Sequence, residues 1–310
     1  MIKKSSIRRI CIATLALFIL LIIYLFPTKD LKTTQNLNYI KEKEMPIFLI
    51  DKNNYVARTS IIKRSENTED KIKEIINYLT KNSNNSSYIK EGFKTIIPEN
   101  TKVLDLKIED NVLTINFSKE LLNVNESDEE SMIEAIIYSL LEINDIKKIK
   151  ILVDANGLES LPNSKIKLPE YFDKSYGINK MYDIKSLKDT TKTTIYYLSK
   201  YNNDYYYVPI TKIDNSNTEK IEVIIKELKS TPIYHTNLIS YLASSTDLTN
   251  YELLENNIKL SFNNNLIANI DDDKITEIVK YSIALSIRDT YGYKDVSFKI
   301  LDNPEINLSI

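Results

Sequence analysis

The chain has 310 residues, which is enough for two domains, because a single hydrophobic core rarely grows beyond about 250 residues. Hydrophobic residues make up 43% and charged residues 27% of the chain, a balance that indicates a folded globular protein and excludes a disordered one. The net charge of -2 provides no overall attraction to nucleic acid, so nucleic acid is not an expected partner.

The N-terminus has the pattern of a membrane anchor. Residues 10–26 form an uninterrupted, largely apolar run, at the short end of the roughly 17–25 residues that span a bilayer. Four basic residues precede the run, which favours an N-terminus inside and the rest of the chain outside. We therefore predict a cytoplasmic tail over 1–9, a transmembrane helix over 10–26 and a tether over 27–45, in a single-pass cell-membrane protein with extracytoplasmic domains.

A removed signal peptide is the alternative interpretation of this segment. No small-x-small cleavage site follows the apolar run, which ends in Tyr24, Leu25 and Phe26 before Pro27. Lipoprotein processing requires a cysteine at the end of such a run, whereas Cys11 lies at its start. Because Cys11 is the single cysteine, the exported part can form no disulfide.

The rest of the chain contains one pattern twice. A helix is predicted in each half, because apolar residues recur there at i, i+3, i+4 and i+7, after Thr68 and Thr218 as capping residues. Alternating apolar residues then predict a strand in each half, preceded by a partner strand over 103–108 or 248–253. The helical positions are Ile72, Ile75, Ile76 and Leu79, and Ile221, Ile224, Ile225 and Leu228; the strand positions are Leu113, Ile115 and Phe117, and Ile258, Leu260 and Phe262.

A second helix and a closing strand complete each unit. The helices begin after acidic runs at 128–130 and 271–273, and aligning Tyr138 with Tyr281 superimposes them. Equivalent positions lie 143 to 149 residues apart over all the elements, for example Tyr138 and Tyr281 (281 − 138) or Ile72 and Ile221 (221 − 72). Such a constant separation indicates a duplicated domain.

The predicted fold class is α+β, with a transmembrane helix followed by two tandem domains over 46–158 and 193–310. Each domain has the order β-β-α-β-β-α-β, and we expect a mostly antiparallel sheet with two helices on one face. The connector over 159–192 contains several aromatic residues, so part of it is expected to pack on a domain.

Three short runs carry a resemblance to a known family. They are Ile97-Pro98-Glu99-Asn100-Thr101-Lys102-Val103, Asn111-Val112-Leu113-Thr114-Ile115-Asn116-Phe117-Ser118 and Ile151-Leu152-Val153-Asp154. With the duplicated order of elements, they resemble the GerMN family of sporulation and spore-germination domains, and particularly its GerM-like members with two such domains behind a membrane-targeting segment. The resemblance covers about 46–158 and 194–306.

This resemblance implies a role in spore formation, between the membranes of the mother cell and the forespore. It implies protein partners in an envelope complex or channel that joins the two cells, and a later role in germination. The family pattern contains no catalytic residue, so none is carried over to this chain.

The residues themselves provide little catalytic chemistry. His235 is the single histidine and has no cysteine or second histidine to complete a zinc site, so we interpret it as a loop residue. Asp271, Asp272 and Asp273 lack the spacing of a calcium loop and are interpreted as acids at a helix start. A glycosidase is not indicated either, because the sequence has no pair of acidic residues accompanied by aromatic platforms for a sugar. We therefore predict no catalytic residue, no cofactor and no metal, and the chain is not expected to be an enzyme.

A tyrosine-rich hairpin in the second half is the candidate interface. Tyr205 and Tyr207 share one face of a strand, and Tyr196 lies on the partner strand. Packing within the sheet is one interpretation of these side chains. Use in a recognition surface is the other, because tyrosine buries a large area at low entropic cost.

We therefore expect a non-enzymatic scaffold or assembly factor for an envelope complex between mother cell and forespore. The alternative is a receptor for a small ligand or peptidoglycan in germination, with its site between the domains. An envelope hydrolase acting on spore cortex is a third hypothesis.

Overall fold

The computed structural model describes residues 14, 15, 17, 44–230, 237–255, 257–266, 273–300 and 305–310. Residues 38–310 form one compact unit, separate from residues 1–37. The predicted tail, the tether up to residue 43 and most of the predicted anchor lie outside the described residues. No helix among the described residues is sufficiently long and apolar to cross a membrane.

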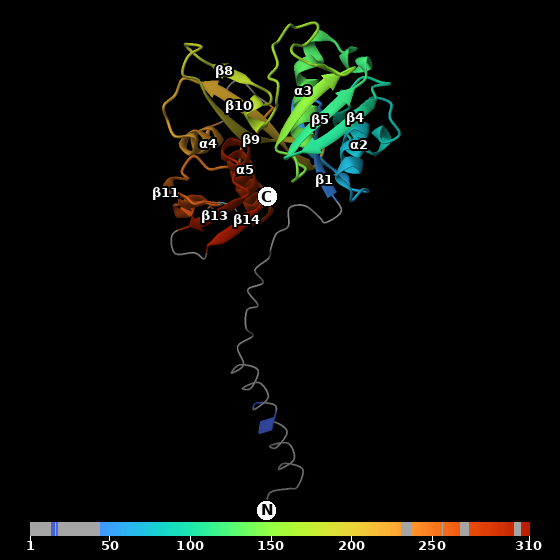
Figure 1. Cartoon of the computed structure of the whole chain (residues 1–310). Coiled ribbons are helices and arrows are strands. Elements are labelled where there is room, and N and C mark those ends of the chain that lie inside the picture. Colours follow the sequence, from blue (N-terminus) through green and yellow to red (C-terminus); the bar gives the residue numbers. More distant parts are fainter. Residues whose placement is uncertain are drawn as a thin grey trace, which may run out of the picture. The chain divides into compact units, whose positions relative to one another are not determined.

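The first domain runs from β1 to β7 (Figure 1). Its elements are β1 (Glu44–Asp51), β2 (Val56–Ile62), α2 (Thr68–Leu79), β3 (Phe93–Lys94), β4 (Val103–Glu109), β5 (Val112–Phe117), α3 (Glu126–Leu140), β6 (Lys148–Val153) and β7 (Asn156–Gly157), with 3-10 turns η1 (Ser86–Tyr88) and η2 (Lys119–Leu122).

The connector contributes the 3-10 turn η3 (Lys174–Tyr176) and strand β8 (Met181–Asp183), and the second domain runs from β9 to β14. Its elements are β9 (Thr191–Tyr201), β10 (Asp204–Asp214), α4 (Lys220–Lys229), β11 (Leu248–Leu253), β12 (Asn257–Phe262), the 3-10 turn η4 (Asn264–Leu266), α5 (Asp273–Tyr291), β13 (Asp295–Ile300) and β14 (Ile306–Ser309).

Local sequence explains how these elements begin and turn. Asp110 and Asn111 join β4 to β5 with φ of 48° and 63°, as expected of the two central residues of a tight hairpin turn. Helix α2 is capped by Asn67, whose side chain accepts a hydrogen bond from the Glu69 N–H at 2.8 Å. The predicted capping residue Thr68 is instead the first residue of the helix.

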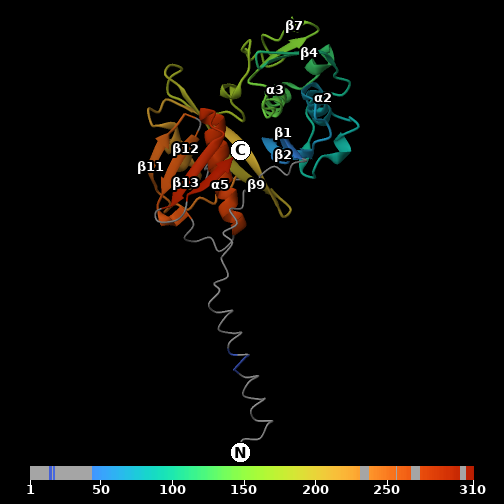
Figure 2. The same ribbon diagram turned by 60° about the horizontal axis from the view of Figure 1, so that its bottom comes forward.

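The helices lie between two sheets, which differs from the expected sheet with helices on one face only. In the first domain, α2 and α3 lie between the β1–β2 hairpin and the sheet β4-β5-β6-β7 (Figure 2). Residues 132–140 of α3 are all buried, so this helix is covered on every side. The β1–β2 hairpin and the sheet β4-β5-β6-β7 each have an apolar face to bury. A helix that is apolar all round can cover both faces.

Parallel pairing is the second difference from the expected fold. Strand β5 pairs in parallel with β6, and β12 pairs in parallel with β13. In each case the helix between the two strands, α3 or α5, returns the chain to the same end of the sheet, which makes the strands parallel. The outer pairs, β4–β5 and β11–β12, are antiparallel as expected.

Two hydrophobic cores result, one in each domain. The connector packs in part on the first core, where Phe172 is 1% exposed and pairs with Ile149 through two backbone hydrogen bonds. The first hairpins of the two domains share one six-stranded sheet, in which β2 lies next to β10. This shared sheet makes the junction between the domains.

Candidate interaction site at the junction of the two domains

The two domains are related by equivalent hydrogen bonds from a strand to a helix. Ser139 of α3 accepts from the Phe48 N–H at 2.8 Å, and Ser286 of α5 accepts from the Tyr196 N–H at 2.8 Å. The serines lie 147 positions apart (286 − 139), so the alignment of Tyr138 with Tyr281 is wrong by about one helical turn.

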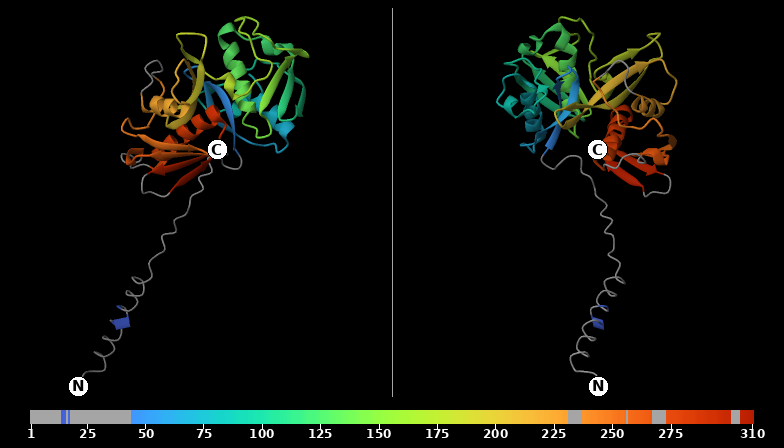
Figure 3. Two further views of the ribbon diagram at one scale, coloured as in Figure 1. Left: turned by 60° about the vertical axis from the view of Figure 1, so that its left-hand side comes forward. Right: turned by 180° about the vertical axis from the view of Figure 1, so that it is seen from behind.

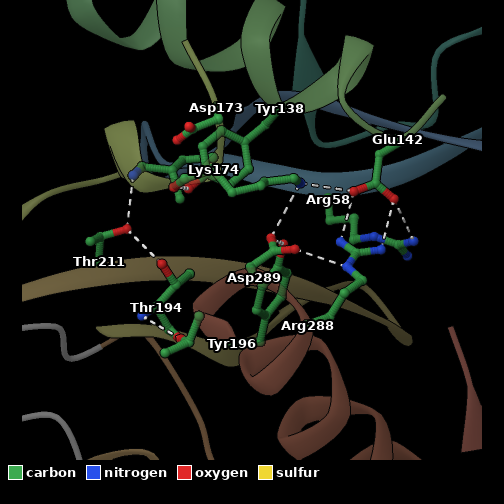
Figure 4. A network of polar contacts seen from close by, with 12 residues as sticks. Arg58, Tyr138, Glu142, Asp173, Lys174, Thr194, Tyr196, Thr211, Arg288 and Asp289 are labelled. Carbon is green, nitrogen blue, oxygen red and sulfur yellow. Dashed lines mark hydrogen bonds and ion pairs between the residues drawn. The ribbon is translucent and has the colours of Figure 1, made fainter. Parts of the chain in front are cut away.

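The corrected alignment makes two acids equivalent. Glu142 directly follows the end cap of α3, and Asp289 lies in the last turn of α5, also 147 positions apart (289 − 142). A carboxylate near the C-terminus of a helix meets the negative end of the helix dipole and needs cations to stabilise it. Both acids are placed at the junction of the domains (Figure 4).

The backbone contact between the domains is short. Strands β2 and β10 are antiparallel and pair only at Arg58 and Tyr207 within the described residues. Beside this pair, the Asn179 side chain accepts from the Val56 N–H at 2.9 Å and donates to the carbonyls of Val56 and Pro209 at 2.8 and 2.7 Å. The connector thus inserts a side-chain amide in place of further strand-to-strand bonds. The hairpins that meet here are seen from behind in Figure 3 (right).

A buried ion-pair network lies beneath this strand contact. Arg288 donates to both Glu142 oxygens, at 2.7 and 3.0 Å, and to Asp289 Oδ1 at 2.8 Å. Lys174 of the connector reaches Glu142 Oε1 at 3.0 Å and Asp289 Oδ2 at 3.3 Å, and Arg58 reaches Glu142 Oε2 at 3.3 Å. The Tyr196 hydroxyl donates to Asp289 Oδ2 at 2.5 Å (Figure 4). The network therefore combines both domains and the connector.

Burial and charge act in opposite directions on the two acids. Burial alone would raise the pKa of Glu142, but the charges of Arg288, Lys174 and Arg58 outweigh it and hold that pKa well below its ordinary value. Burial likewise opposes ionisation of Asp289, and Arg288 and Lys174 lower its pKa. Both acids are therefore charged at neutral pH, and three cations surround the two negative charges.

The arrangement can fix the orientation of the two domains. The Glu142 and Asp289 side chains are 4% and 1% exposed, and Glu142 accepts hydrogen bonds from Arg58 of the first domain and Arg288 of the second. Burial and the Asp289 charge raise the pKa of Tyr196 well above its ordinary value, so its hydroxyl stays protonated and acts as a donor. Buried charge pairs of this kind specify one geometry more than they add stability.

A second set of contacts joins the hairpins farther along. The Tyr206 hydroxyl of β10 donates to Asp51 of β1 at 2.8 Å, and the rings of Tyr206 and Phe93 meet edge to face at 4.9 Å. Gly92, with φ of 87°, approaches Tyr201 so closely that a Cβ there would lie 2.7 Å from the ring. The first domain therefore packs on the tip of the β9–β10 hairpin.

A groove opens where β2 and β10 diverge. Its volume is about 570 Å³, and residues of both domains line it. The lining includes Ser60, Lys90 and Phe93 from the first domain and Tyr201, Asn202 and Tyr205 from the second. An aromatic groove with polar groups at its rim has the composition of a small-ligand site.

The three tyrosines of the predicted interface have different positions. Tyr196 is fully buried in the ion-pair network, and Tyr207 is 6% exposed next to the strand contact. Tyr205 is half-buried at the groove, where its hydroxyl forms a 2.7 Å hydrogen bond with that of Tyr241. Tyr205 is thus the one of the three whose side chain faces a groove without being buried.

The network residues were not identified from the sequence. Glu142 follows a predicted helix and resembles a surface acid, and Arg288 and Asp289 lie in an ordinary helical pattern. One signal was available, because the chain has only five arginines among its 41 basic residues and two of them are Arg58 and Arg288. Arginine is the residue best suited to buried, bidentate pairs with carboxylates.

The other acidic candidates have structural roles where they are described. Glu129 in the first turn of α3 accepts backbone hydrogen bonds from Asn163 and Ser164 at 2.8 Å, which attaches the connector to the helix. His235, Asp271 and Asp272 lie outside the described residues. Among the residues described, no group of three or more His, Cys, Asp or Glu side chains is arranged to hold a metal ion.

Comparisons with known proteins agree with this architecture. Residues 46–159 match the Germane family, described as "Sporulation and spore germination". The chain is 28% identical over 267 residues to the spore germination protein GerM of Bacillus subtilis (strain 168), covering 84% of this chain and 72% of that protein. The structure matches the tandem GerMN domains of the sporulation protein GerM from Bacillus subtilis with a TM-score of 0.76 and 24% identity, covering 86% of this chain and 96% of the other.

The match to the Germane family is restricted to the first domain, whereas the matches to GerM extend over both domains. The structural match extends the same fold to the second domain, in agreement with the equivalent hydrogen bonds of Ser139 and Ser286. The first domain therefore matches the Germane family model, and the two domains together have the fold of the tandem GerMN domains of GerM.

Proposed function

We propose that this chain acts in spore formation or germination as a non-enzymatic scaffold, anchored by residues 10–26 and with its two domains outside the cytoplasm. The similarity to GerM supports the sporulation-related role. The proposed partners are proteins of an envelope complex between the mother cell and the forespore.

The observation that supports a scaffold is the buried network at the junction. Glu142 contacts cations from β2, the connector and α5, so a single carboxylate joins three separate parts of the chain. A fixed arrangement of two domains presents surfaces at constant distances, which assembly requires and which a flexible pair of domains would not provide.

The test is genetic. We expect that deletion of the gene in a sporulating host displaces the fluorescently labelled proteins of the envelope channel and lowers spore yield. A full chain carrying Glu142→Gln, which weakens the junction, should restore both only in part, whereas wild type restores them fully. Normal localisation and normal spore yield after deletion would contradict the scaffold.

The groove at the junction favours a second candidate function, a receptor for a small germinant or a peptidoglycan fragment. Its volume of about 570 Å³ lies within the ordinary range for ligand pockets, and Tyr205 lies at its wall. Calorimetric titration of the full chain with germinants and peptidoglycan fragments tests this function. Saturable heat that Tyr205→Ala abolishes would support the receptor, and the absence of heat would exclude it for the ligands tested.

A further inference from the structure

The connector carries a group of exposed apolar side chains. Ile166, Tyr171, Tyr182 and Leu187 are 37%, 45%, 63% and 89% exposed. All four line the same hollow, which has a volume of about 460 Å³. Single exposed apolar residues are common on protein surfaces, but a group around one hollow marks an interaction site. These four residues are called the connector patch below.

Leu187 is the most exposed of the four, and its backbone is held in place. The Asn215 side chain accepts from the N–H groups of Lys185 and Ser186, at 2.7 and 3.1 Å, and donates to the carbonyls of Ser186 and Lys188, at 3.0 and 2.8 Å. Four hydrogen bonds from one amide therefore fix the loop that presents Leu187 to solvent. Because the backbone of the loop is already ordered, less entropy is lost when a partner binds Leu187.

The two tyrosines are presented from fixed backbone in the same way. Tyr182 lies in β8, which pairs in parallel with Lys212 to Asp214 of β10. Tyr171 precedes Phe172, whose N–H and carbonyl pair with those of Ile149 at 2.8 and 2.9 Å. The connector patch is thus attached to both domains, to the first through Phe172 and to the second through β8 and Asn215.

The rim of the connector patch is basic. Residues 159–192 contain seven lysines and five acids, although the whole chain has a net charge of -2. Lys167 lines the hollow, and Lys185 and Lys188 flank Leu187. Among the described residues, the salt bridges of the connector are formed by other lysines. The charges of these three lysines are therefore exposed to solvent and available to a partner.

We propose that the connector patch binds an acidic segment of a partner protein, which inserts apolar side chains into the hollow. Apolar anchors in a concave site with a ring of opposite charge have the form of a protein docking site. An anionic membrane surface is disfavoured, because the hollow is concave and the apolar side chains lie around it, whereas a bilayer surface needs an apolar face that can lie in the plane of the membrane. This proposal rests on the scaffold function in that it names a surface through which the scaffold holds a partner.

The first experiment measures binding directly. Two fluorescein-labelled peptides of about 15 residues share one pattern of leucine and phenylalanine, with glutamate between the apolar residues in one and lysine in the other. Fluorescence anisotropy with the full chain should show micromolar binding of the acidic peptide, roughly tenfold or more tighter than that of the basic one. Replacement of Tyr182 and Leu187 by serine should weaken binding of the acidic peptide at least about tenfold.

A matched control variant carries Leu104→Ser and Leu253→Ser, since both leucines are exposed, lie in β4 and β11 and do not line the hollow. It should bind the acidic peptide as wild type does. Equal binding of both peptides, equal losses in the two double variants, or Leu187-dependent binding of anionic vesicles without peptide binding would each overturn the proposal.

Complementation in cells separates this proposal from the scaffold function. If deletion lowers spore yield, the full chain with Tyr182→Ser and Leu187→Ser should fail to restore it at normal protein levels. Full restoration would overturn the connector proposal and leave the scaffold intact. If deletion has no effect, the scaffold function fails, and the peptide measurements still decide whether the connector patch binds.

Discussion

The junction and the connector patch reverse the usual distribution of side chains. At the junction, two buried acids are held by the buried Arg58 and the partly buried Arg288 and Lys174, whereas at the connector patch four large apolar side chains face solvent. The buried charges are all paired across separate segments, so they fix a geometry. The exposed apolar groups are held on fixed backbone without a cover, so they are ready to bind. The charged residues of the junction thus maintain the arrangement of the domains, and the residues of the connector patch are available for binding a partner.

The largest effect is expected when the junction loses its central charge. Glu142→Gln leaves Arg58, Arg288 and Lys174 facing one remaining acid in a buried site. We expect the free energy of unfolding in urea to fall by about 3–5 kcal/mol. The matched control is Glu170→Gln, since Glu170 pairs with Lys150 on the surface and its loss should not measurably change stability. Equal stability of the two variants would contradict the role given to the network.

The same network predicts a pH dependence. The pKa values of Glu142 and Asp289 are lower in the folded protein than in the unfolded chain, because cations surround them despite their burial. Their contribution to stability is therefore complete above the unfolded values, near about 4, and is lost as the pH falls below them. Urea midpoints should be constant from about pH 7 to 5.5 and decline below about 4. A decline that is equally steep in Glu142→Gln would assign the effect to other acids.

A smaller effect tests the contact of the first domain with the β9–β10 hairpin. Gly92 and Gly292 both have positive φ, near 85°, so alanine strains the backbone at both positions. A Cβ at Gly92 would also meet the Tyr201 ring at 2.7 Å, whereas Gly292 faces open space. Gly92→Ala should therefore cost about 1–3 kcal/mol more than Gly292→Ala in urea unfolding. Equal losses in the free energy of unfolding of the two variants would show that the hairpin tip moves aside without an energetic cost.

The smallest effect on stability is expected at the connector patch. Leu187 is 89% exposed, so Leu187→Ser should change the free energy of unfolding by less than about 0.5 kcal/mol. Its effect should appear instead in the binding of the acidic peptide. A large loss of stability would mean that Leu187 supports the fold, and the distinction between the two regions would fail.

Local patterns in the sequence predicted the elements but not their assembly. The apolar stripe beginning at Ile72 and the alternation around Ile115 correctly indicate α2 and β5, because burial on one face imposes those periods. The same patterns do not indicate which sheet packs on which face of a helix. The parallel pairing of β5 with β6 and the position of α3 between two sheets were therefore not expected. These features depend on how α3 crosses over and on its burial all round.

The junction could be predicted least. Ion pairs join residues as far apart as Arg58, Glu142 and Arg288, and nothing in the local pattern around each residue specifies its partners. The tyrosine-rich hairpin was recognised, yet the sequence could not distinguish buried Tyr196 from half-buried Tyr205. The alternation of side chains along a strand shows which residues share a face, but not which other element packs on that face. The connector patch lies outside the repeat, so the duplication gave no indication of it.

The equivalence of Glu142 and Asp289 has a consequence for the two copies. The acids occupy the same place in both copies, but the position of Arg288 is Leu141 in the first copy, and Lys174 belongs to a connector that occurs once. Each copy therefore brings one acid and one arginine of its own to the network, Arg58 from the first and Arg288 from the second. The two halves are thus complementary and not interchangeable, and a chain built from either copy alone would not form this network.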